Sequence, residues 1–145
     1  PYPGGQVFDP PETMFTLQHS PNWTADGTLI VSTHDVGETR QLAREFAVEA
    51  DVLREIWSVE TPDFAEYGGQ IQALPSGKRL WQLGTAGVVQ EITPEGDAVW
   101  RVEWPGHLVG NATPIADLYA LSLRARSSGR GPGRGSQSRS DAPSP

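Results

Sequence analysis

The chain of 145 residues is acidic, with 11 Lys and Arg against 18 Asp and Glu, and it contains no cysteine. The lack of cysteine excludes disulfides and thiolate metal sites, and no apolar run is long enough to cross a bilayer. The 16 Gly and 13 Pro favour many short strands joined by turns over long helices. These features predict an all-β protein with no membrane span.

The charges are divided unevenly along the chain. Residues 1–123 hold six basic against seventeen acidic residues, so we do not expect nucleic acid as a partner, because phosphate binding needs a basic surface. Residues 124–145 are rich in Arg, Gly, Ser and Pro and poor in apolar side chains, which predicts a disordered tail. Residues 1–12 are expected to form an opening loop, and they show no leader from which export is readable.

Between residues 13 and 123 the sequence contains two copies of one unit of strands. The turn of Gly27 returns at Gly77, 50 residues later, and Trp57 returns at Trp100, 43 residues later. This spacing is the period of a propeller blade. Only the first copy is preceded by a histidine, His19, so the repeat itself does not require that residue.

Each copy predicts four strands from short β-rich runs between turn signals. The predicted strands are 14–18, 28–33, 42–48 and 52–59 in the first copy, and 69–74, 79–83, 88–92 and 98–103 in the second. Segment 40–54 also has helix-forming residues, but its duplicate carries a Pro and a Gly, which favours strands.

Four antiparallel strands make a blade, so we expect a partial β-propeller of about two four-stranded antiparallel blades. Residues 108–123 are expected to close or brace the ring. Because two blades cannot close a ring and leave sheet faces uncovered, we expect the chain to be the C-terminal part of a larger propeller.

The residues from Gln18-His19 through Asp26-Gly27-Thr28-Leu29, Glu45-Phe46 and Glu55-Ile56-Trp57 to the run over 90–100 resemble the arylsulfotransferase family of bacterial-type six-bladed propellers. That resemblance implies transfer of a sulfuryl group from a phenolic sulfate ester to a phenol, with no nucleotide donor and no cofactor. It also implies a periplasmic or secreted location and small-molecule partners, an aryl sulfate and a phenol.

In that family the histidine of the Gln-His step is the nucleophile, which here is His19. A neutral imidazole suits attack on sulfur. Three further residues are substrate-binding candidates: His34 because it lies at the end of the next strand, Trp23 as a stacking surface just after His19, and Arg40. Arg40 lies five residues before Glu45, whereas the family tends to place its arginine three before, so its role departs from the pattern.

Other interpretations stay open. His19 is alternatively a propeller histidine that bonds to a neighbouring blade, and the protein is alternatively a non-catalytic propeller that binds or scaffolds at the cell envelope. Residues 93–100 also resemble a docking repeat of quinone-dependent dehydrogenases. Two histidines beside Asp35 are too few for a convincing metal site, so none is expected. The charge that develops on sulfuryl oxygens needs fixed donors, which the resemblance places mostly in preceding blades. Because two blades leave the channel wall incomplete, we expect the chain to be inactive alone.

Overall fold

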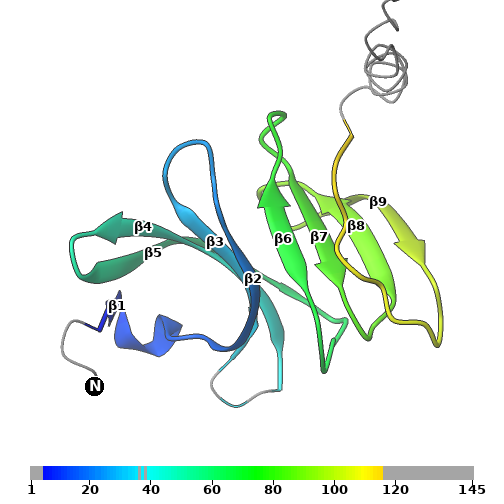
Figure 1. Cartoon of the computed structure of the whole chain (residues 1–145), viewed down its shortest axis with the longest axis horizontal. Coiled ribbons are helices and arrows are strands. Elements are labelled where there is room, and N and C mark those ends of the chain that lie inside the picture. Colours follow the sequence, from blue (N-terminus) through cyan, green and yellow to red (C-terminus); the bar gives the residue numbers. More distant parts are fainter. Residues whose placement is uncertain (1–4, 36, 38, 116–145) are drawn as a thin grey trace, which may run out of the picture. The chain divides into compact units, whose positions relative to one another are not determined.

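The computed structural model describes residues 5–35, 37 and 39–115, which fold into strands and confirm the all-β prediction. Figure 1 shows these strands as two sheets. The first sheet has the order β1-β5-β4-β3-β2 and the second has the order β6-β7-β8-β9. The first is built from β1 (Val7–Asp9), β2 (Thr16–Trp23), β3 (Leu29–His34), β4 (Gln41–Glu49) and β5 (Val52–Thr61); the second from β6 (Gln70–Ala73), β7 (Arg79–Leu83), β8 (Val88–Ile92) and β9 (Ala98–Glu103).

The eight predicted strands are all present. Strands β7, β8 and β9 have the predicted bounds, and segment 40–54 forms β4 and the start of β5 rather than a helix. Strand β2 runs to Trp23, five residues beyond the predicted end at Gln18, because two bulges carry the pairing through this stretch.

The predicted opening loop over residues 1–12 differs in its described part. It contains β1 and a 3-10 helix, η1 (Pro11–Thr13), and β1 pairs in parallel with β5. The ring of Phe8 packs edge-on against Phe15 and Phe46, at 5.1 and 5.8 Å between centroids. This aromatic contact holds the segment against the first sheet, and a three-residue strand gives too short a pattern to be recognised from sequence.

The two copies of the repeat agree in detail. Gly27 and Gly77 have φ of 78° and 84°, and the N–H of each donates to the carbonyl three residues earlier. Glycine adopts this left-handed conformation without steric cost. Strands β4 and β8 also carry a register shift at matching places, after Glu45 and after Glu91. The repeat in the sequence is therefore also a repeat in the structure.

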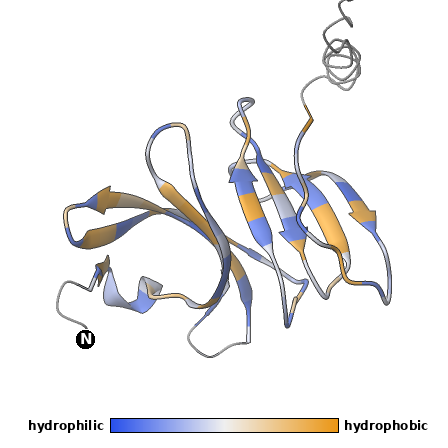
Figure 2. Cartoon of the chain, in the orientation of Figure 1, coloured by the Kyte–Doolittle hydropathy of each residue, from blue (hydrophilic) through white to orange (hydrophobic). Residues whose placement is uncertain are grey.

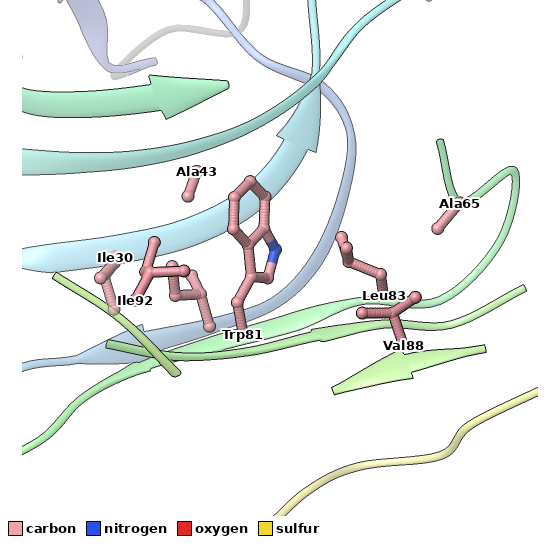
Figure 3. Packing of buried hydrophobic residues seen from close by; sticks show 8 residues of the cluster. Ile30, Ala43, Ala65, Trp81, Leu83, Val88 and Ile92 are labelled. Atoms are coloured by element: carbon pink, nitrogen blue, oxygen red, sulfur yellow. The ribbon is translucent and has the colours of Figure 1, made fainter. Parts of the chain in front are cut away.

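The main core lies between the two sheets. Successive residues of a strand point to opposite faces of its sheet, and Figure 2 shows apolar residues on the strands of both sheets. Trp81, 1% exposed, reaches from β7 toward Ala43 of β4 (Figure 3), and its Nε1 donates to Oγ of Ser32 at 3.0 Å. The buried cluster consists of Ile30, Ala43, Ala65, Ile71, Trp81, Leu83, Val88 and Ile92. Burying each large apolar side chain contributes about 1.5–3 kcal/mol.

A charged contact joins the sheets beside this core. The guanidinium of Arg79 lies 2.8 Å from the carboxylate of Glu45 and 5.0 Å from the ring centroid of Trp57. The indole Nε1 of Trp57 in turn donates to the carbonyl of Pro94 at 2.6 Å. These polar contacts fix the register of the two sheets against each other.

The described part of the predicted closing segment lies against the second sheet. The amides of Gln82 and Gln72 donate to the carbonyls of Val109 and Ala112, at 2.5 and 2.7 Å. Residues 116–123 and the predicted tail over 124–145 lie outside the described residues. Within the residues that the structure describes, no helix has the length and apolarity needed to cross a membrane.

Candidate functional site

Two bulges place His19 on β2. Thr16, His19 and Asn22 pair with His34, Ser32 and Ile30 of β3, so on each side of His19 two residues of β2 lie opposite one residue of β3. The bulges contain Leu17 and Ser20, whose φ of 48° and 42° are left-handed. Such a conformation costs a non-glycine residue about 1–3 kcal/mol and is often found at functional sites. Bulges of this kind change the direction of a side chain.

The side chain of His19 lies on the face of the first sheet that packs against the second. Its cross-strand partner Ser32 shares that face, because opposed residues point to the same side, and Ser32 accepts the bond from Trp81. His19 is half-buried, and its Nε2 is buried without a hydrogen bond among the described residues. Burial, and secondarily the electrostatic effect of His34, lower the pKa of His19 below 6.5. The imidazole is therefore mainly neutral at pH 7, as a nucleophile requires.

His34 is held in one orientation. Its Nε2 lies 2.9 Å from the carbonyl oxygen of Ala65 and 3.1 Å from Oε1 of Gln41. Both oxygens accept, so Nε2 carries the proton, and Nδ1 of the neutral ring is an acceptor. That Nδ1 is buried and has no partner within the described part of the chain. The ring also stacks on Phe64 at 4.6 Å between centroids.

The structure brings the two predicted histidines together. The rings of His19 and His34 lie 6.4 Å apart between centroids, at an interplanar angle of 76°. His34 bonds to the carbonyl of Ala65 in the connection between the sheets. For His19 no such bond is found among residues 5–115.

A cavity of about 570 Å³ lies beside His34. Its lining consists of Leu17, His34, Phe64, Glu66, Tyr67 and Thr85. Sequence reasoning missed the contribution of the connection between β5 and β6. The signal that could have identified this connection is the pair of aromatic residues in the short run Phe64-Ala65-Glu66-Tyr67 between two strands.

The other two predicted substrate-binding residues lie apart from this cavity. Trp23 is 66% exposed and lies four residues along β2 from His19, about 13 Å at ~3.3 Å per residue. The guanidinium of Arg40 contacts the carboxylates of Asp35 and Glu60, each at 3.2 Å. Its charge is therefore already balanced.

The described residues include no group of three or more His, Asp or Glu side chains that could hold a metal ion. Asp35, next to His34 in sequence, is instead used within its own loop. The backbone N–H of Arg40, followed by that of Thr39 and both side chains, lowers the pKa of Asp35 to about 2. This carboxylate organises the β3–β4 connection.

No protein-family model, no curated protein and no solved structure matches this chain.

Proposed function

We propose that this chain supplies two blades of a β-propeller of the arylsulfotransferase kind, in which His19 carries a sulfuryl group from an aryl sulfate to a phenol. The observation that carries the proposal is the state of His19: a half-buried imidazole of lowered pKa, placed between two bulges, whose Nε2 has no hydrogen bond within the described part of the chain. The location that accompanies this function is the periplasm or the exterior of the cell.

The repeat supports a propeller because the outer face of the second sheet has the same pattern as the covered face of the first. Cross-strand pairing makes Leu80, Gln82, Val89, Glu91, Trp100 and Val102 the equivalents of Ile30, Ser32, Ala43, Glu45, Trp57 and Val59. In the first sheet the second sheet packs on this face. In the second sheet Trp100 and Val102 remain 41% and 42% exposed. A further blade stacked in the same direction would cover them.

The chemistry proceeds in two halves. A ring nitrogen of His19 donates its electron pair to sulfur, the bond from sulfur to the phenolic oxygen breaks, and the phenolate leaves with that electron pair. The oxygen of the acceptor then attacks the same sulfur, the nitrogen–sulfur bond breaks, and its electron pair returns to the ring. The proton of the acceptor hydroxyl passes to a base or to solvent.

Fixed donors for the sulfuryl oxygens belong, in this proposal, to other blades. Among the described residues, the cavity lining contains the carboxylate of Glu66 and no Lys or Arg, whereas the charge that grows on these oxygens must be met by hydrogen-bond donors or cations. The activity is thus assigned to a closed propeller that includes this chain.

A second candidate is a non-catalytic propeller that binds or scaffolds at the cell envelope. The lack of a cation among the described residues around the cavity favours it. In that case the histidine pair serves packing, and replacing His19 leaves no chemical defect.

Release of 4-nitrophenolate from 4-nitrophenyl sulfate, with phenol as acceptor, distinguishes the sulfuryl transferase from the non-catalytic scaffold. The assay uses a closed propeller that contains this chain. His19→Asn is expected to abolish release. His107→Asn, in an exposed loop where Nδ1 lies 3.0 Å from the carbonyl of Pro105, is the matched control and is expected to keep the rate. Equal rates for wild type and His19→Asn would favour the scaffold.

A further inference from the structure

The walls of the cavity beside His34 suit a flat apolar ring. Leu17, Phe64 and Tyr67 present large apolar surfaces to it and are 49%, 42% and 63% exposed. Its volume of about 570 Å³ lies within the usual range for small-molecule sites, which are lined mainly by apolar and aromatic side chains. An aromatic ring packed edge-on or offset against these residues would gain from both burial and ring contacts.

The polar groups of the cavity select for charge. Nδ1 of the buried His34 has no partner among the described residues, and with the proton on Nε2 it is a hydrogen-bond acceptor in the neutral ring. Glu66 adds a carboxylate, and the described residues of the lining include no Lys or Arg to pair with an anion. A ligand that donates hydrogen bonds or carries positive charge fits these groups, and an anion does not.

We infer that this cavity binds a phenol that carries no negative charge, with the phenolic hydroxyl donating to Nδ1 of His34 and any cationic substituent near Glu66. Since it rests on the proposed function, the inference names the acceptor: the cavity takes the phenol. The hydroxyl is then bound one imidazole ring away from His19, whose ring centroid lies 6.4 Å from that of His34.

Access to Nδ1 requires a wall side chain to give way, because His34 is 1% exposed. Leu17 and Phe64 are both close to half exposed and border the same cavity. Leu17 also lies on a bulge, where the strand is not bound in a regular ladder. Binding is therefore expected to move these two side chains and to leave the anchored ring of His34 in place.

The test is a titration of the chain, labelled with ¹⁵N-histidine, with two phenols of opposite charge. Tyramine is expected to shift the ¹⁵N resonance of His34 Nδ1. It is also expected to bind about three- to tenfold more tightly than 4-hydroxyphenylacetate, as an exposed carboxylate and aromatic faces favour a cation. Equal affinity for both phenols, or no shift at His34 with either, overturns the inference.

Glu66→Gln is expected to remove the preference for tyramine while preserving binding of the ring. Glu95→Gln changes an exposed carboxylate in the turn between β8 and β9, outside the cavity, and is the matched control. Glu95→Gln should keep the preference. Loss of the preference in both variants would assign it to net charge rather than to the cavity and would contradict the inference.

His19→Asn separates this inference from the proposed function. This variant leaves the cavity lining unchanged and is expected to bind tyramine as the wild type does. If tyramine binds as expected but transfer does not depend on His19, the proposed function fails alone. If His19 carries the sulfuryl group but neither phenol shifts His34, the inference fails alone.

Discussion

The rings of His19 and His34 lie edge to face, 6.4 Å apart between centroids, yet only His34 is anchored. Its Nε2 donates to Ala65 and Gln41, whereas Nε2 of His19 is buried with no partner among the described residues. An unpartnered buried nitrogen costs free energy, which structures usually avoid. The pair thus joins a fixed imidazole to one that is available for a new bond.

The lowered pKa of His19 predicts a pH dependence. In NMR titration the Cε1 proton of His19 should show a midpoint below 6.5. Because the unfolded chain binds this proton more tightly than the folded chain, the free energy of unfolding should fall as the pH falls from 6.5 through the folded pKa. Above pH 6.5 the ring adds no pH dependence. His19→Asn should lack this part of the curve, and an unchanged curve in that variant would refute the assignment.

Trp81 should be the most costly tryptophan to remove. Trp81→Ala deletes a side chain that is 1% exposed and leaves Oγ of Ser32 without its indole donor. The expected loss is about 3–5 kcal/mol in the free energy of unfolding. Urea denaturation followed by circular dichroism measures it. Trp23→Ala, at a side chain 66% exposed, should cost less than about 1 kcal/mol; a similar loss in both variants would contradict the described core.

The ion pair between the sheets should contribute more to the free energy of unfolding than an ion pair at the surface. Arg79→Ala leaves the carboxylate of Glu45, only 7% exposed as a residue, without its guanidinium partner. Removing one partner of a buried pair costs about 3–5 kcal/mol. Arg54→Ala removes a pair with Asp9 whose side chains are 49% and 44% exposed, and about 0–1 kcal/mol is expected. Thermal and urea unfolding of the two variants should reveal this order, and the reverse order would be inconsistent with it.

Much of this organisation is readable from the sequence, because turn glycines and β-rich runs are local signals. Gly27 and Gly77 marked the repeat, and they indeed form equivalent turns. Contacts that depend on distant partners were not readable. The bond from His34 to Ala65 joins residues 31 positions apart, and the sequence around His34 does not indicate that partner. The two bulges around His19 were missed because a bulge changes pairing without changing β-propensity.

Close backbone approach makes Gly84 irreplaceable. A Cβ at this position would lie 2.1 Å from the carbonyl oxygen of Tyr67 and 2.8 Å from the backbone of Gly68. Because backbone cannot give way like a flexible side chain, Gly84→Ala should separate the turn after β7 from the connection after β5, which together border the cavity. Hydrogen exchange of Thr85 N–H, which donates to Tyr67, should become faster. Gly110→Ala, with open space around its Cβ, should leave that exchange rate unchanged; equal rates in the two variants would rule out this close contact.

The central claim is that a bond forms between His19 and sulfur, and trapping that bond tests it most directly. A closed propeller containing this chain is mixed with 4-nitrophenyl sulfate without acceptor, quenched at alkaline pH and digested, and the peptides are sequenced by mass spectrometry. The peptide of His19 is expected to carry the added mass of one SO₃ group, localised to the imidazole and lost on addition of phenol. An unmodified His19 peptide, or SO₃ found on another residue, would contradict it.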